Sequence, residues 1–271
     1  MKIAVAGCAG RMGRMLVQEI LAADTVTLAG GTEPQGSPFL GQDIGRLVGT
    51  TEPLGIAITD DPSRLFSHAD AVIDFTTPDA TTVHARLAAT HRTALIVGTT
   101  GFSPTQQEAV SIAAKSIPIV MSPNMSIGTN LLFALTERVA AILGLDYDIE
   151  ILEMHHRHKV DAPSGTALGL GQAAARGRRT ALDDVSQITR NGHTGPRTPG
   201  TIGFASLRGG DVIGEHSVIF VADGERVELT HKASSRQIFA RGAIRAARWC
   251  NGRRPGLYSM QDVLGLTPRT P

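Results

Sequence analysis

The 271-residue chain has few aromatic residues, only two cysteines and almost no net charge. Phe, Trp and Tyr make up 4% of the sequence, which is too few for a platform on which nucleic-acid bases could stack. The formal net charge is +1, so the composition indicates no general attraction to nucleic acid or to an acidic membrane surface. We therefore expect neither nucleic acid nor a membrane as a partner.

Long hydrophobic runs and a disulfide framework are also missing. No apolar stretch approaches the roughly 20 residues of a membrane-spanning helix. The first residues already read as a strand, which leaves no room for a signal peptide. Cys8 and Cys250 lie far apart in the sequence and fit a reducing compartment. These features predict a cytoplasmic protein, and the 42% hydrophobic content is enough for one large or two modest domains.

The N-terminal segment has the pattern of a dinucleotide-binding fold. Residues 1–6 form an apolar run typical of a strand buried on both faces, and residues 14–22 form an amphipathic helix. Between them, glycines 7, 10 and 13 let the backbone turn tightly and approach a pyrophosphate at the helix N-terminus. A second strand over 26–31 precedes Glu33, about 20 residues on, where an acid meets the ribose hydroxyls. The predicted cofactor-binding residues are Gly7, Cys8, Ala9, Gly10, Arg11, Met12 and Glu33.

Strands and helices continue to alternate through the N-terminal half. Strands are expected over 71–75, 94–97 and 117–121, and helices over 79–90 and 104–115. In an open parallel sheet the ligand lies beyond the carboxyl ends of the strands, so the polar loops there should line it. Each loop alone is compatible with an ordinary turn, but three at successive strand ends favour a cofactor site. The residues predicted to face the nicotinamide are Thr76, Thr77, Gly98, Thr99, Thr100, Ser122, Pro123, Asn124 and Met125.

The segment from Glu153 to Ala167 reads E-M-H-H-R-H-K-V-D-A-P-S-G-T-A. Ser164 is a suitable N-cap, so the free amides of Gly165 and Thr166 should point out of a helix end and attract an anion. Cationic side chains lie just upstream, and histidines supply proton donors near neutral pH. The segment predicts a pocket for a small, multiply anionic molecule.

Two other interpretations of this segment are weighed against the pocket. A charge-rich run is often a solvated loop before an ordinary capped helix. His155, His156 and His158 also lie close enough together to suggest zinc. No helical H-E-x-x-H is present, neither cysteine is nearby, and a cationic lysine among the ligands would repel the metal. We therefore expect no metal.

The second half of the chain changes character. Short strands are expected over 201–208, 214–221 and 226–232, with hairpin turns at 209–211 and 223–224, followed by a helix over 235–250. Antiparallel hairpins beside a doubly wound sheet indicate a separate domain. The predicted fold class is α/β, a Rossmann-like doubly wound parallel sheet with a second α+β domain that carries an open, largely antiparallel sheet.

Several motifs together resemble the 4-hydroxy-tetrahydrodipicolinate reductase family, also called dihydrodipicolinate reductase. They are G-C-A-G-R-M-G at Gly7, G-T-T-G-F at Gly98, S-P-N-M-S-I-G at Ser122, the histidine segment at Glu153, G-H-T-G-P-R-T-P-G-T-I-G-F-A at Gly192, G-D-V-I-G-E-H at Gly210 and T-H-K-A-S-S-R at Thr230. The resemblance spans essentially the whole chain. The histidine segment is highly specific to the family, whereas the glycine loop is not.

The resemblance implies a reaction, its residues and an assembly. The substrate would be a dicarboxylate, a cyclic imine of the diaminopimelate route to lysine, reduced with NADH or NADPH. His155 and Lys159 match the family's catalytic residues, and His156, Gly165 and Thr166 match its substrate contacts. It also implies a homotetramer that pairs the C-terminal sheets. The implied domains are a dinucleotide-binding domain of residues 1–125 plus 236–271 and a substrate-binding and tetramerisation domain of residues 126–235.

The residue after Glu33 departs from the family pattern and bears on cofactor choice. Some family members supply an arginine directly after this acid, but Pro34 stands here. Glu33 favours the ribose hydroxyls of NADH, whereas Arg11 is still able to reach a 2′-phosphate. We expect both cofactors to work, with NADH modestly preferred. The alternatives to the reductase are another NAD(P)-dependent amino-acid or keto-acid dehydrogenase and a nucleotide-binding sensor without turnover.

Overall fold

The structure is a computed structural model that describes residues 1–266. It divides into two compact units. Unit 1 consists of residues 1–127 and 237–266, and unit 2 consists of residues 128–236. Each unit has its own sheet and its own hydrophobic core.

Unit 1 is built on a sheet of six parallel strands in the order β11-β5-β4-β3-β1-β2. The strands are β1 (Lys2–Ala6), β2 (Thr27–Thr32), β3 (Ala71–Asp74), β4 (Ala94–Val97), β5 (Pro118–Met121) and β11 (Gly256–Tyr258). Because β2 and β3 flank β1 on opposite sides, the direction of winding reverses beside β1. A doubly wound sheet leaves a crevice beyond its carboxyl ends at such a reversal.

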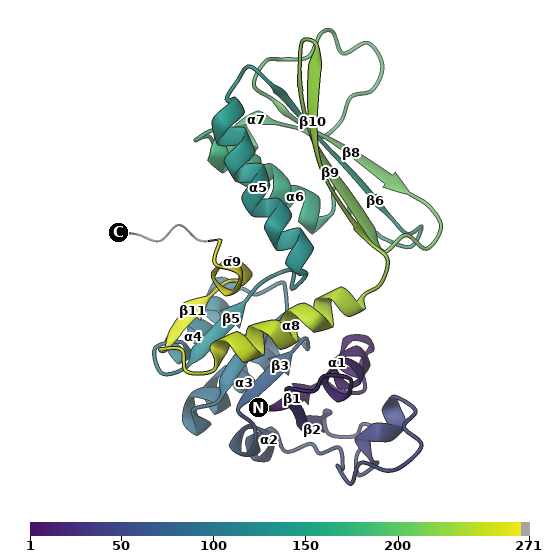
Figure 1. Ribbon diagram of the computed structural model, residues 1–271, viewed down its shortest axis with the longest axis vertical. Helices are drawn as coiled ribbons and strands as arrows, with labels where there is room; N and C mark the ends of the chain where they lie inside the picture. The colour runs from purple at the N-terminus through teal and green to yellow at the C-terminus, as the bar shows by residue number, and fades with distance from the viewer. Residues whose placement is uncertain (267–271) are drawn as a thin grey trace. The chain divides into compact units, whose positions relative to one another are not determined.

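Helices cover both faces of this sheet, because alternate residues of each buried strand point to opposite faces. Ile3 and Val5 of β1 join the core under α1 and α8, whereas Ala4 and Ala6 join the core under α2, α3 and α4. The helices are α1 (Arg11–Leu21), α2 (Pro62–His68), α3 (Pro78–His91), α4 (Pro104–Ala113), α8 (Gln237–Cys250) and α9 (Met260–Leu264), with a short 3-10 helix η1 (Ile44–Leu47). Figure 1 labels the α-helices.

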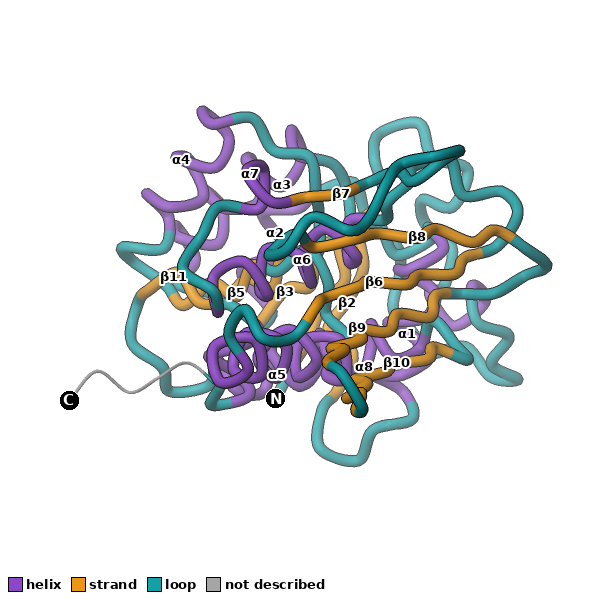
Figure 2. Tube along the Cα trace, turned by 90° about the horizontal axis from the view of Figure 1, so that it is seen from above, coloured by secondary structure: helices purple, strands orange, loops and turns teal. Residues whose placement is uncertain are grey.

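Unit 2 contains a mixed sheet in the order β10-β9-β6-β8-β7, and Figure 2 shows its strands side by side. Strand β6 pairs with β9 antiparallel and with β8 parallel. The strands are β6 (Asp148–His155), β7 (Ser186–Gln187), β8 (Ile202–Arg208), β9 (Gly214–Ala222) and β10 (Glu225–Ala233). Helices α5 (Ile127–Leu143) and α6 (Gly165–Gly177) cover one face, while α7 (Leu182–Val185) is short (Figure 1).

The predicted fold class is confirmed: a parallel sheet of six strands is joined to a second unit with a mixed sheet. The Asp223-Gly224 turn does connect an antiparallel hairpin, with Ala222 opposite Glu225 and Gly224 at a φ of +86°. The hairpin expected at 209–211 was wrong. Strand β6 lies between β8 and β9, so those two strands are not neighbours.

Element ends also differ from the prediction. Helix α1 begins at Arg11 instead of residue 14, because Gly10 already has the extended conformation of an N-cap residue. The elements that were not predicted are helices α2, α5, α7 and α9, the 3-10 helix η1, and strands β6, β7 and β11. None of the helices within residues 1–266 is both long enough and apolar enough to cross a bilayer.

Candidate active site

The loop between β1 and α1 depends on two glycines. Gly7 has a φ of +66°, a conformation that side chains disfavour. A β-carbon on Gly13 would lie 2.1 Å from the carbonyl oxygen of Gly7, so the helix packs on the loop only with glycine there. Arg11 and Met12 lie in the first turn of α1, where Arg11 is exposed. This tight turn leads into a helix N-terminus and fits a pyrophosphate.

Glu33 lies directly after β2 and is bonded to the glycine loop. Its Oε1 accepts a hydrogen bond of 2.8 Å from the amide of Ala9, and its Oε2 accepts one of 3.4 Å from the hydroxyl of Ser37. The predicted acid therefore lies beside the loop in space, although 24 positions separate it from Ala9 in the sequence. Cys8 lies beneath it, buried and not disulfide-bonded, and burial raises its thiol pKa to about 12. A thiol with that pKa is not a nucleophile at neutral pH.

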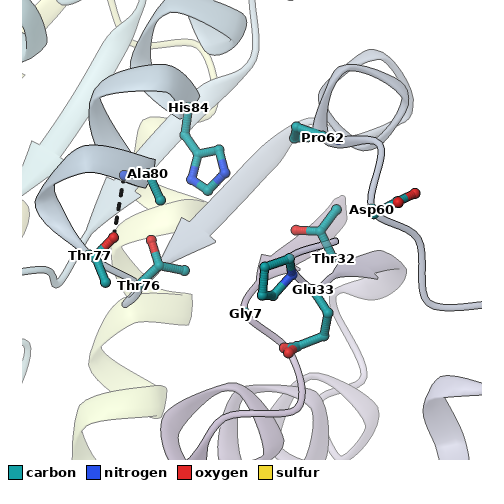
Figure 3. Close-up of a pocket in the computed structure, with 10 residues that line it drawn as sticks. Gly7, Thr32, Glu33, Asp60, Pro62, Thr76, Thr77, Ala80 and His84 are labelled. Carbon is teal, nitrogen blue, oxygen red and sulfur yellow. Dashed lines mark hydrogen bonds between the residues drawn. The ribbon is translucent and has the colours of Figure 1, made fainter. Parts of the chain in front are cut away.

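A pocket of about 320 Å³ opens at the carboxyl ends of β1, β2 and β3 (Figure 3). It lies at the reversal of winding, where the topology predicts a nucleotide site. Gly7 and Glu33 line it, and so do residues of the β3–α3 connection that were expected on the nicotinamide side. The full lining is Gly7, Thr32, Glu33, Pro34, Asp60, Pro62, Thr76, Thr77, Ala80 and His84. The glycine loop, the acid and this pocket fit a dinucleotide.

The loops after β4 and β5 are ordered by internal hydrogen bonds. Gly98 packs against the ring of Phe75, which leaves no space for a side chain, since a β-carbon would lie 2.2 Å from the ring. Thr99 is buried and bonded to Thr81, whereas Thr100 is exposed. The second loop holds Ser122, Pro123, Asn124 and Met125, in which the Ser122 hydroxyl donates to the carbonyl of Asn124 at 2.8 Å. Both loops follow neighbouring parallel strands, so they lie at the same edge of the sheet as the pocket.

In unit 2, His155 is the last residue of β6 and is held by a buried carboxylate. Its Nδ1 lies 2.5 Å from Glu153 Oε2, two residues earlier on the same face of the strand. Glu153 is 1% exposed and also accepts two hydrogen bonds from the Arg208 guanidinium, at 2.8 and 2.9 Å. The backbone amide of Ser164, at the start of α6, donates to the same carboxylate at 3.2 Å. One carboxylate thus joins the end of β6, the end of β8 and the start of α6.

The other side of His155 faces His216 and Gly214. The imidazole rings of His155 and His216 meet edge to face at 5.0 Å, and His216 Nε2 is bonded to the Ser164 hydroxyl at 3.1 Å. A β-carbon on Gly214 would lie 3.0 Å from Nε2 of His155. A side chain at position 214 would therefore crowd the nitrogen that does not bond Glu153.

Lys159 and His156 follow in the turn after β6. The Lys159 ammonium donates to Asp161 at 2.8 Å, and its side chain is largely covered. Nδ1 of His156 is buried and has no hydrogen-bond partner among residues 1–266. Gly165 and Thr166 form the first turn of α6, with Ser164 as N-cap accepting from the amide of Ala167 at 3.2 Å. All five predicted catalytic and substrate-contact residues lie between the end of β6 and the first turn of α6, and His158 in the same segment is exposed.

The charges around His155 have opposing effects on its pKa. Burial is the largest effect and lowers the pKa, the charges of Lys159 and Arg208 lower it further, and Glu153 raises it without reversing the shift. Burial also lowers the pKa of His216 to about 4. For Glu153, burial raises the pKa, but the hydrogen bonds from Arg208 and His155 outweigh it and bring the value to about 2. The free site therefore holds neutral histidines beside an ionised carboxylate.

Several residues of these sites were not predicted from the sequence. Arg208 and His216 lie in strands that were predicted from their residue pattern alone, with no site role for either residue. Asp74 and His84 lie in a strand and a helix that were predicted only as parts of the sheet domain. Their signal is a polar residue at a position that the strand or helix buries. No group of three or more His, Cys, Asp or Glu side chains within residues 1–266 is arranged to hold a metal ion.

Comparison with known proteins covers the whole chain. The dihydrodipicolinate reductase N-terminal family model matches residues 1–125, and the C-terminal model matches residues 128–264. The chain is 57% identical over 267 residues to the 4-hydroxy-tetrahydrodipicolinate reductase of Brucella melitensis, with 98% of this chain and 99% of that protein covered. It is 54% identical over 264 residues to the enzyme of the same name from Dinoroseobacter shibae, with 97% and 98% covered.

A solved structure gives the same result for the fold. The dipicolinate-bound dihydrodipicolinate reductase from Paenisporosarcina sp. TG-14 matches with a TM-score of 0.78 at 23% identity. The match covers 97% of this chain and 98% of that chain. At this level of identity the likeness shows the two-unit fold alone.

Proposed function

The chain belongs to the 4-hydroxy-tetrahydrodipicolinate reductase family, and we propose from this and from the site that it reduces the family's cyclic imine through His155 and Lys159. The family acts in lysine biosynthesis by the diaminopimelate pathway and uses NAD(P)H. The ring of the small dicarboxylate substrate loses its 4-hydroxyl group as water and gains one hydride and one proton. The products are tetrahydrodipicolinate and the oxidised cofactor.

The observation that carries the residue assignment is the contact network of His155. Glu153 holds Nδ1, so the imidazole is fixed in orientation and its Nε2, which a side chain at position 214 would crowd, is the nitrogen left for the substrate. His155 is neutral in the free site, so its Nε2 would first take up a proton, and the two substrate carboxylates would favour this by raising the pKa of the imidazole. The imidazolium is then suited to deliver that proton as negative charge develops on the ring. NADH or NADPH, when bound, supplies the hydride.

Lys159 and the start of α6 would bind the two carboxylates of the substrate. The Lys159 ammonium would bind one carboxylate and stabilise the developing charge, in exchange for its present contact with Asp161. The amides of Gly165 and Thr166, at the positive end of the helix dipole, would bind a carboxylate as well. Nδ1 of His156, buried without a partner among the described residues, supports a polar contact to the substrate.

Cofactor binding is assigned to unit 1. The glycine loop, Glu33 and the loops after β4 and β5 would hold the dinucleotide, with NADH modestly preferred because Pro34 offers no cation to a 2′-phosphate. Unit 2, in this proposal, binds the substrate and forms a homotetramer through its sheet. Consumption of NAD(P)H in a biosynthetic route supports a cytoplasmic location.

An absorbance assay tests the reaction. Substrate is generated in situ from pyruvate and aspartate semialdehyde by the preceding enzyme, and loss of reduced-cofactor absorbance is followed after this protein is added. We expect rapid loss that requires both the substrate-generating enzyme and this protein. Cofactor binding without any loss of absorbance would indicate the sensor alternative instead.

A further inference from the structure

Beside the pocket of unit 1 lies a buried, hydrogen-bonded pair of an aspartate and a histidine that the reaction does not use. Asp74, at the end of β3, is completely buried, and its Oδ2 lies 2.7 Å from Nδ1 of His84 on α3. Its Oδ1 accepts hydrogen bonds from the amide and the hydroxyl of Thr76, at 2.8 and 2.6 Å. Both oxygens of the carboxylate are therefore occupied, and the His84 ring has a fixed orientation.

That orientation leaves one ring nitrogen for the pocket. His84 is 8% exposed and lines the pocket, and Figure 3 shows its ring reaching in from α3 above Thr76. The hydrogen on Nδ1 points to the Asp74 carboxylate. Burial raises the pKa of this carboxyl group, but the hydrogen bonds from His84 and Thr76 outweigh burial and keep the pKa low. In the neutral imidazole, Nε2 is then a hydrogen-bond acceptor.

The position of His84 within the pocket selects the part of the dinucleotide that it meets. Gly7 belongs to the pyrophosphate loop, and Glu33 is the acid of the ribose. The rest of the lining combines the apolar residues Pro34, Pro62 and Ala80 with polar groups, which are Thr32, Asp60, Thr76, Thr77 and His84. Among the polar groups, the His84 imidazole has its orientation fixed by a buried carboxylate. Apolar surface beside an oriented acceptor suits a flat heteroaromatic base that carries an amino group.

We propose that Nε2 of His84, oriented by Asp74, accepts a hydrogen bond from the 6-amino group of the cofactor's adenine. This inference rests on the proposed cofactor site and adds a specificity-determining residue to it. The pair then distinguishes adenine from purines with a carbonyl oxygen at the same position, because two acceptors would face each other. Leaving a polar group in a largely buried site without its partner costs binding energy.

The test compares NADH with deamino-NADH, in which hypoxanthine replaces adenine. Titration of reduced-nicotinamide fluorescence with the wild-type protein should show NADH binding about fivefold more tightly, the factor expected for one hydrogen bond. Equal affinities, or tighter binding of deamino-NADH, would overturn the proposal while leaving the cofactor site intact. Failure of both compounds to bind would instead refute the cofactor site on which the proposal rests.

Variants assign the effect to His84. His84→Phe should bring the affinity ratio close to one, mainly by weakening NADH binding, whereas His84→Gln retains an acceptor oxygen and should keep part of the preference. His91→Phe, on the same helix and outside this pocket, is the matched control and should keep the full ratio. A preference that survives in His84→Phe overturns the assignment. The wild-type comparison needs no variant, so the proposal stays testable even if His84→Phe folds poorly.

Discussion

Glu153 connects three parts of unit 2, and His155 depends on it for its orientation. The carboxylate bonds the imidazole of His155, the guanidinium of Arg208 and the amide of Ser164. His155 and Lys159, in contrast, act on charge that develops only as the substrate reacts. Their substitution should therefore affect turnover far more than folding.

For the catalytic pair, we expect His155→Gln and Lys159→Ala each to reduce kcat by about 100-fold or more, the range typical of a lost general acid or electrostatic contact. NADH affinity should stay near the wild-type value, because neither residue belongs to unit 1. Thermal unfolding should also change little, because a glutamine amide can still donate to Glu153 and the Lys159–Asp161 pair is partly exposed. Steady-state kinetics and fluorescence titration measure the two effects separately. Near-normal kcat in either variant would remove that residue from the catalytic role.

For Glu153, the expected effect is on stability and depends on pH. Its pKa is about 2 in the folded protein against an ordinary 4.5, so its charge stabilises the fold fully above pH 4.5 and loses that contribution as the pH falls toward 2. Glu153→Gln should lower the free energy of unfolding by about 3 kcal/mol at neutral pH. Denaturant unfolding at several pH values should show the deficit shrinking below pH 4.5.

A control for that experiment lies on the surface of the same unit. Glu137 forms an exposed ion pair with Arg176, and pairs of this kind contribute little. Glu137→Gln should therefore change the free energy of unfolding by less than about 1 kcal/mol at any of these pH values. A Glu153→Gln deficit that does not vary with pH would show that packing, not charge, accounts for it.

Cofactor preference is expected to depend on the residue after Glu33. Pro34 lines the pocket and carries no charge, so Pro34→Arg would place a cation where a 2′-phosphate binds. We expect the ratio of NADPH to NADH affinity to rise several-fold, since one partly exposed charge contact is worth about 1 kcal/mol. Gln35→Arg adds the same charge one residue away and is the control. Clearly tighter NADPH binding to the unmodified protein would show that Glu33 does not govern the choice.

At the scale of elements, the features that were predicted correctly are those determined by residues close together in the chain. The β1–α1 loop, the alternation of unit 1 and the β9–β10 turn all depend on residues close together in the chain. Strand β6 was missed because two of its buried positions are Glu153 and His155, which interrupt the apolar alternation that marks a strand. Its neighbours β8 and β9 follow much later, so neither the sheet order nor the contact with Arg208 was accessible to local reasoning.

The candidate sites were likewise predictable only where their residues are continuous in the sequence. The glycine loop and the histidine segment are continuous in sequence and were found as motifs. The partners that orient them, such as Asp74 for His84 and His216 beside His155, come from other elements. Burial decides their role, and burial becomes visible only when the sheet is assembled.

Substitutions at two glycines test the packing of α1 on the glycine loop and the proposed carboxylate site at the start of α6. Gly13→Ala would place a methyl group 2.1 Å from the Gly7 oxygen, so α1 would have to shift away from the loop. We expect a loss of about 1–3 kcal/mol in stability and weaker NADH binding.

In Gly165→Ala the added methyl group meets no atom within 4 Å, so stability should stay within about 0.5 kcal/mol of wild type. The substitution should instead raise KM for the substrate, because the methyl group borders the proposed carboxylate site.

Chemical denaturation, cofactor titration and steady-state kinetics on the two glycine variants separate these outcomes. A stable Gly13→Ala variant with normal NADH affinity would contradict the role given to the loop. An unchanged KM in Gly165→Ala would argue against carboxylate binding at the start of α6.

At the scale of the whole molecule, the sheet of unit 2 has one face that its own helices do not cover. Ile149 and Ile151 face α5 and α6, so the residues that alternate with them point the other way. On that face Leu207 is 47% exposed and Val221 is 36% exposed. Open sheets with apolar faces and unpaired edges tend to associate, and the family resemblance implies that four copies do so here.

We therefore expect light scattering at micromolar concentration to give the mass of a homotetramer, and Leu207→Glu to reduce it to smaller species. The glutamate would place four like charges in the assembly while leaving the exposed position of the monomer unstrained. Ile112→Glu, at a 54% exposed position on α4 of unit 1, is the matched control and should stay tetrameric. Dissociation by Ile112→Glu alone would place the interface on unit 1, and a monomeric wild-type protein would rule out the tetramer altogether.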